Sequence, residues 1–275
     1  MSSPRQTLKA ILPETLHQEV CGAYERIGDI ALVTLPDKLL PYQEQIGAAL
    51  LTGEAHVRLV ARRRQPIGGE FRLGGFEIIA GAPPLSTTHR ENGLRFAVDV
   101  DKVYFSARLA GERLRLARLC QADERVLVVG SGVAPLPLTL AAHGLAAEIM
   151  GIEKNPDAHM LALENLHLNR RHSHKVRPQL ADYRDLTPAD FGLFDRVIVA
   201  MPEIAGTALP HCLPFIRPGG ILHVYIFHDA SQPPPASEIA TILTAAGREA
   251  ISLTAVRCGH CGRSRFRYCL DVRLK

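Results

Sequence analysis

Short apolar runs alternate with longer segments of mixed polarity through the second half of the chain. The apolar runs have the length of strands and lie at residues 126–129, 149–152, 176–180, 194–200 and 221–227. The segments between them are long enough for helices, so the pattern predicts a mostly parallel sheet with helices on both faces. Two further strands, at 250–258 and 266–274, are joined by a turn too short for a helix, and we expect them to pair antiparallel.

The first part of the chain is less regular and contains short strands and glycine-rich turns. The pattern predicts strands at 24–35, 57–60 and 94–100, a hairpin over 67–81 and a helix at 41–51. We interpret residues 87–93 as a polar connection and residues 105–119 as a helix with Ser106 as its N-cap. On this basis residues 1–88 form a small α+β domain and residues 89–275 form the larger α/β domain.

The stretch from 125 to 153 carries the clearest candidate chemistry. A strand ends at Gly130-Ser131-Gly132, a small-residue helix follows, and the next strand ends at Glu153. Glycines at this turn allow the backbone to bend tightly and to approach a ligand closely. Glu153 is placed to accept hydrogen bonds from both ribose hydroxyls of a nucleotide, and Asp182, after the third strand, could bind an adenine amino group. The pattern predicts a pocket for an adenosine-containing cofactor.

The residues after the glycine turn help to distinguish between cofactors. A dinucleotide motif has a third glycine, where its pyrophosphate meets the helix N-terminus. This chain has Ala134 there, followed by Pro135 and Pro137. That substitution favours S-adenosylmethionine (SAM), which has no phosphate, over NAD. With the terminal hairpin, the predicted sheet resembles the doubly wound α/β fold of the class I SAM-dependent methyltransferases.

Long stretches of the chain also resemble one family within that class. They are GEFRLGGFEIIAG (69–81), TTHRENGLRFAVDVDKVYFSARLAGERLRLA (87–117) and RPGGILHVYIF (217–227). The family is that of the archaeal and eukaryotic tRNA guanosine-37 N1-methyltransferases and their wybutosine-pathway relatives, which transfer an aminocarboxypropyl group from SAM. The resemblance covers nearly the whole chain from Leu12. It implies a SAM-dependent methyltransferase acting on tRNA, with the small domain helping to position the RNA.

The resemblance also implies roles for two charged residues. Arg72, in the FR segment, and Glu112, in the ER segment, match residues that serve the reaction at guanine N1. A base must remove the N1 proton as the nitrogen attacks the methyl group, and an arginine near O6 would stabilise the negative charge that develops. From the residues alone, Glu112 could instead pair with Arg108 or Arg115 on a solvated helix face, and Arg72 could be a sheet-surface charge.

Further site residues follow from the same motifs. Tyr104 could stack on the target base. The other candidates for substrate contact are Arg90, Asn92 and Arg108, and Met201 and Pro202 are candidates for cofactor contact.

Two positions depart from the family pattern. Val128 stands where the family usually has an aspartate before the glycine turn, and Ala200-Met201-Pro202 stands where an asparagine precedes Leu/Pro-Pro. The missing amide removes a hydrogen-bonding group that a buried base would need. Three alternatives therefore stay open: aminocarboxypropyl transfer, action on a small molecule or peptide, and binding of SAM or RNA without catalysis.

Composition and charge add broad limits. Hydrophobic residues make up 47% and charged residues 22% of the 275-residue chain, which excludes wholesale disorder. The net charge of +4 includes several basic clusters that could contact tRNA phosphates, at residues 62–64, 170–171 and Arg263, Arg265 and Arg267. The sequence has no signal peptide and no apolar run of about 18 residues, so we expect a cytoplasmic protein that does not enter a membrane.

Cysteines near the C-terminus have part of a zinc-site spacing. Cys258 and Cys261 flank His260, and Cys269 follows eight residues after Cys261. A closed site would need a fourth ligand, so we predict free thiols and no bound metal, with a zinc site as the alternative.

Overall fold

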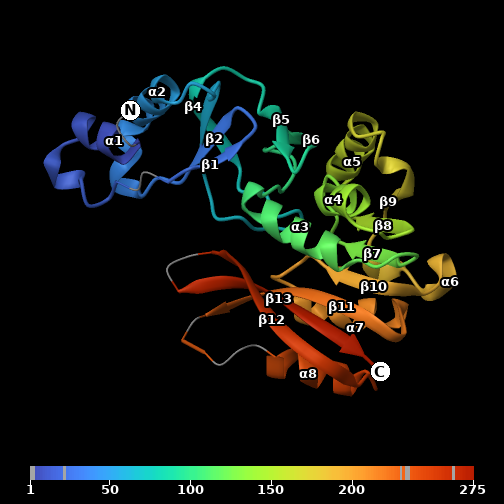
Figure 1. Cartoon of the computed structure of the whole chain (residues 1–275). Coiled ribbons are helices and arrows are strands. Elements are labelled where there is room, and N and C mark those ends of the chain that lie inside the picture. The colour runs from blue at the N-terminus through green and yellow to red at the C-terminus, as the bar shows by residue number, and fades with distance from the viewer. Residues whose placement is uncertain (1–3, 21–22, 230, 233–235, 262–263) are drawn as a thin grey trace. The chain divides into compact units, whose positions relative to one another are not determined.

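The computed structural model describes residues 4–20, 23–229, 231–232, 236–261 and 264–275. It consists of two compact units, Met1–Ala107 and Arg108–Lys275, and each is described by itself (Figure 1). Arg263 of the predicted basic loop lies outside the described residues.

The first unit is built on a four-stranded sheet covered by two helices. The strands lie in the order β1 (Glu25–Ile27), β2 (Ile30–Val33), β3 (Leu59–Arg63) and β4 (Phe76–Gly81), and only the β2–β3 pair among them is parallel. Helices α1 (Pro4–Ile11) and α2 (Gln43–Gly53) contribute Leu8, Ile46 and Leu50 to an apolar cluster with Val33, Val60 and Ile79 of the sheet. The predicted 67–81 hairpin is only partly present, because β4 is the only strand described there and a single bridge joins Gly68 to Leu73.

A separate hairpin follows this sheet, formed by β5 (Ser86–Glu91) and β6 (Leu94–Asp99). Asn92 and Gly93 join the strands with φ angles of 49° and 77°, as a type I′ turn requires. The interpretation of 87–93 as a polar connection is therefore wrong. The segment is a strand because alternate polar residues make specific contacts: Thr87 donates to the Asp29 carboxylate (2.7 Å), and the Gly28 N–H donates to His89 Nδ1 (3.1 Å).

These contacts place the hairpin in the first compact unit, which ends at Ala107. The boundary expected at 88/89 instead falls within β5, so it divides this hairpin between the two domains. The position of the boundary therefore depends on whether sequence motifs or spatial contacts define it.

The second unit contains a seven-stranded sheet in the order β12-β13-β11-β10-β7-β8-β9. Its members are β7 (Arg125–Val129), β8 (Glu148–Glu153), β9 (Val176–Leu180), β10 (Phe194–Val199), β11 (Ile216–Asp229), β12 (Ala250–His260) and β13 (Arg265–Leu274). The first five in chain order are parallel, and β13 pairs antiparallel with both β11 and β12. The predicted doubly wound fold with a terminal antiparallel hairpin is confirmed.

Helices cover both faces of this sheet (Figure 1). They are α3 (Ala110–Leu119), α4 (Pro135–His143), α5 (Pro156–Leu168), α6 (Pro188–Phe191), α7 (Ala205–Cys212) and α8 (Ala236–Ala245). Helix α3 is shorter than predicted, because a 3₁₀ turn at Ala107–Leu109 precedes it. The Ser106 hydroxyl donates to Glu25 Oε1 (3.1 Å) within the first unit, and Ser106 directly precedes the 3₁₀ turn, so its role as the helix N-cap stays a prediction.

Candidate active site

The glycine turn at the end of β7 needs the residues found there. Gly130 and Gly132 have φ angles of 75° and 57°, in the left-handed region that favours glycine. The N–H groups of Gly130 and Ser131 both donate to the Ile152 carbonyl at 3.0 Å, which ties the turn to β8. A Cβ at Gly130 would lie 2.6 Å from Met201 Cγ, so any larger residue would displace Met201.

Glu153, at the end of β8, is held by two backbone N–H groups. Its Oε2 accepts from Gly132 (2.7 Å) and its Oε1 accepts from Asn155 (2.8 Å). Each carboxylate oxygen can accept a second hydrogen bond. The side chain is therefore oriented before any ligand binds, with capacity left for two hydroxyl donors.

Asp182, after β9, caps a short 3₁₀ turn, Tyr183–Asp185, by accepting from the Arg184 N–H (3.0 Å). Its carboxylate also pairs with Lys154 Nζ at 2.8 Å. Hydrogen bonds from the Arg184 side chain and from Lys154 hold the pKa of Asp182 well below its usual range, so the carboxylate is ionised at neutral pH.

The segment after β10 completes this edge of the sheet. The Ala200 N–H donates to the Val129 carbonyl (2.9 Å), and Met201 lies against Gly130. The predicted cofactor residues therefore follow the carboxyl ends of four neighbouring strands: β9, β8, β7 and β10. In doubly wound sheets, ligands bind at this edge, where the strand order reverses.

Val128 is fully buried within β7. Central parallel strands are covered on both faces, which favours the continuous apolar run seen here.

Glu112 is buried on α3, with 7% of its surface exposed. It accepts hydrogen bonds from Arg115 Nε (2.7 Å) and Nη2 (2.8 Å) and from the Tyr225 hydroxyl (3.1 Å). The ion pair with Arg115 that sequence spacing suggested is present. Glu112 does not, however, lie on a solvated face of the helix.

Arg72 and Tyr104 meet within the first unit. The guanidinium carbon of Arg72 lies 4.1 Å from the centre of the Tyr104 ring, which is cation–π geometry. Arg72 has a φ of 59°, a left-handed conformation that residues other than glycine rarely adopt. Backbone strain of this kind is concentrated at functional sites, so it is compatible with the predicted role of Arg72.

The remaining substrate candidates occupy varied positions. Arg90 is exposed on β5 opposite Arg95, Asn92 forms the type I′ turn, and Arg108 lies in the 3₁₀ turn before α3. The conformation of Asn92 gives it a structural role in the hairpin.

Sequence reasoning did not identify Tyr225, which contacts Glu112, or Asp271, which contacts Arg115. It also did not identify His223, which contacts Asp271. The sequence contains one indication of these residues, because polar side chains stand inside otherwise apolar strands at ILHVYIF and CLDVRL. Such residues are found in cores only when they are paired.

Cys258, Cys261 and Cys269 form no disulfide within the described residues, and the expectation that they bind no metal stays a prediction. Within the described residues, Cys269 groups with His223 and Asp271, with potential ligand atoms within 4.8 Å of one another. Arg115 and Arg196 contact Asp271 and His223 directly, at 2.6 and 2.5 Å. Arg196 uses the lone pair of His223 Nε2, and the other ring nitrogen faces Asp271, so the His223 ring offers no lone pair to a cation in this arrangement.

No helix in the described part of the chain is long and apolar enough to cross a membrane.

Two family models match the chain. Residues 87–245 match the model described as the TRM5/TYW2 methyltransferase domain, and residues 5–84 match the TYW2 N-terminal domain. The two matches meet near the domain boundary expected from the sequence.

Two curated proteins illustrate the range of relatives. The tRNA (guanine(37)-N(1))-methyltransferase Trm5b of Pyrococcus abyssi is 34% identical over 222 residues, or 81% of this chain and 65% of that protein. The tRNA(Phe) (4-demethylwyosine(37)-C(7)) aminocarboxypropyltransferase of Pyrococcus horikoshii is 31% identical over 224 residues, or 80% of this chain and 77% of that protein. The chain spans less than two thirds of the length of the Trm5b relatives that it matches.

Solved structures agree with these matches. The complex of aTrm5 with tRNALeu superposes with a TM-score of 0.85 and 26% identity, covering 100% of this chain and 78% of that one. TYW2 of P. horikoshii in complex with MeSAdo gives a TM-score of 0.77 and 26% identity, covering 98% and 97%. The fold, the order of the site residues and the match over 87–245 together show that this chain belongs to the TRM5/TYW2 family.

Proposed function

We propose that the chain is a SAM-dependent transferase that methylates a purine ring nitrogen of tRNA, at the guanosine next to the anticodon. The observation that carries this proposal is the set of polar groups at the carboxyl ends of β7, β8 and β9. The solved relative with MeSAdo supports an adenosine cofactor, and the relative solved with tRNALeu supports the acceptor.

The residues of the pocket fit SAM. Glu153 would accept hydrogen bonds from the ribose hydroxyls, Asp182 would accept one from the adenine amino group, and Gly130 and Gly132 would let the backbone approach the ligand. SAM bound there would supply a carbon made electrophilic by its positively charged sulfur.

Glu112 is proposed as the general base and Arg72 as the donor to the base carbonyl oxygen. Removing the N1 proton makes the nitrogen nucleophilic and shifts negative charge to O6, which a guanidinium stabilises. Tyr104, already in contact with Arg72, would border the base.

Incubation with labelled SAM and unmodified tRNA tests this function. We expect label in tRNA, and we expect Glu112→Gln to reduce kcat by about 10²-fold, because loss of general-base catalysis typically has this size. Undiminished labelling by Glu112→Gln would rule out Glu112 as the base. A protein with no affinity for tRNA at low salt would contradict tRNA as the acceptor.

Aminocarboxypropyl transfer is the second candidate, and two observations favour it. Residues 5–84 match the TYW2 N-terminal domain, and Ala200 lacks the amide that the methyltransferase pattern has. The two reactions differ in which carbon of the cofactor faces the nucleophile. Mass analysis of the modified nucleoside separates them, because a methyl group adds about 14 mass units and an aminocarboxypropyl group adds about 101.

A further inference from the structure

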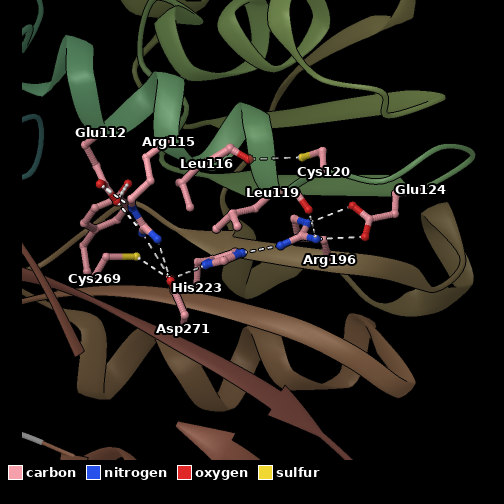
Figure 2. A network of polar contacts seen from close by, with 11 residues as sticks. Glu112, Arg115, Leu116, Leu119, Cys120, Glu124, Arg196, His223, Cys269 and Asp271 are labelled. Carbon is pink, nitrogen blue, oxygen red and sulfur yellow. Dashed lines mark hydrogen bonds and ion pairs between the residues drawn. The ribbon is translucent and has the colours of Figure 1, made fainter. Parts of the chain in front are cut away.

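A row of buried and partly buried polar side chains runs through the second unit, from Glu112 on α3 to Glu124 before β7 (Figure 2). Arg115 donates to Glu112 and also to Asp271, through Nη1 (2.6 Å) and Nη2 (3.2 Å). Asp271 Oδ1 lies 2.6 Å from His223 Nδ1. His223 Nε2 lies 2.5 Å from Arg196 Nη1. The elements that supply this row are far apart in the sequence.

The direction of the hydrogen bonds follows from Arg196. A guanidinium only donates, so His223 Nε2 must accept, and the ring proton must be on Nδ1, where it is donated to Asp271. Burial, together with the neighbouring Arg196, lowers the pKa of His223, which keeps the ring neutral. Asp271 is therefore held in one orientation, with its oxygens directed at Arg115.

The oxygens of Glu112 are not equivalent in this arrangement. Oε1 accepts from Arg115 Nη2 and from the Tyr225 hydroxyl, and these two bonds use both of its acceptor positions. Within the described residues, Oε2 accepts one hydrogen bond, from Arg115 Nε. Oε2 therefore has an acceptor position left for a substrate proton.

The tyrosine and the two cysteines near Glu112 are uncharged, so they do not form ion pairs with its carboxylate. Burial raises the pKa of Tyr225 well above its usual value, that of Cys258 to about 12, and that of Cys269 well above its usual value. These groups on β11, β12 and β13 are neutral at physiological pH. Arg115 is the cation in bidentate contact with the carboxylate.

We propose that Arg115 is a positioning residue for Glu112, held in place by Asp271 and His223, and that it directs Oε2 to take the proton from the substrate base. The proposal rests on the proposed function, in which Glu112 is the general base. The N–H proton moves to Oε2, the nitrogen electron pair forms the bond to the transferred carbon, and the carbon–sulfur bond breaks with its electrons on sulfur.

The pH dependence of kcat in Arg115→Gln tests this role. Without its guanidinium partner, a buried carboxylate takes up a proton more readily, so the acidic limb of the profile should move to higher pH. We expect kcat at neutral pH to fall about 10-fold, with KM for tRNA nearly unchanged. Arg118→Gln, an exposed arginine on the same helix, should leave the profile as in the wild type.

Arg115→Lys provides a second variant if Arg115→Gln folds poorly. Lysine keeps the charge but not the planar bidentate contact. We expect its acidic limb to stay near the wild-type position while kcat falls. An unchanged kcat, or a fall in Arg115→Gln without movement of the acidic limb, would overturn the proposal.

A measurement on the folded protein without substrate separates this proposal from the proposed function. The side-chain carboxyl carbon signal of Glu112, identified by its loss in Glu112→Gln, can be followed against pH by NMR. Its titration should move to higher pH in Arg115→Gln and not in Arg118→Gln. If the wild type modifies no tRNA, the proposed function fails, and this titration still supports or overturns the arrangement.

Discussion

The affinity for SAM should fall about 10³-fold when Glu153 is replaced by alanine. Glu153 already accepts from the N–H groups of Gly132 and Asn155, so its carboxylate is fixed at the carboxyl end of β8. Hydrogen bonds to a charged group contribute roughly 1.5–3 kcal/mol each, and two ribose hydroxyls would lose this acceptor together. Calorimetric titration of the protein with SAM measures the change directly.

Glu148→Ala is the matched control for Glu153→Ala. Glu148 begins the same strand and forms a half-exposed ion pair with Arg125 at 2.7 Å. It lies at the opposite end of β8, and removal of such a pair costs little. SAM affinity should therefore stay at the wild-type value. If Glu153→Ala binds SAM within threefold of the wild type, the pocket is not at this edge of the sheet.

The larger fold was predictable because its central strands are buried on both faces. Such strands appear in sequence as continuous apolar runs, which is what residues 126–129 show. The order of strands and helices then determines a parallel sheet with few topological choices. The same rule explains why the predicted cofactor residues follow adjacent strands, since parallel strands share one carboxyl edge.

The hairpin β5–β6 could not be found from apolar periodicity, because the contacts of β5 are polar. Thr87 and His89 pair with Asp29 and the Gly28 backbone, more than 50 positions earlier in the chain. The usable local signal was Asn92-Gly93, a dipeptide that favours a two-residue hairpin turn.

The surroundings of Glu112 were predictable only within its own helix. Arg115 is three residues away, and helical spacing suggests that pair directly. Tyr225 and Asp271 come from strands more than 100 positions later, so their contacts depend on the completed sheet. For the same reason, sequence spacing could not show that Glu112 is buried.

Arg196→Met should lower the free energy of unfolding by about 3–5 kcal/mol, because it leaves a buried carboxylate without its partner. Arg196 is 2% exposed and donates two hydrogen bonds of 2.8 Å to Glu124 and one of 2.9 Å to the Leu119 carbonyl. Urea unfolding of wild type and variant measures the difference.

The double variant Arg196→Met/Glu124→Leu separates lost pairing from lost packing. Replacing both buried charges with apolar groups is often close to neutral, so the double variant should recover most of the stability lost in Arg196→Met. Lys275→Met removes an exposed pair with Glu249 and should cost under about 1 kcal/mol. A double variant as unstable as Arg196→Met would show that the arginine acts through packing, and that Glu124 tolerates burial alone.

The double variant also removes the donor to His223 Nε2, so the ring proton is no longer confined to Nδ1. If Arg115 positions Glu112 through Asp271 and His223, this variant should regain stability and still lose part of kcat.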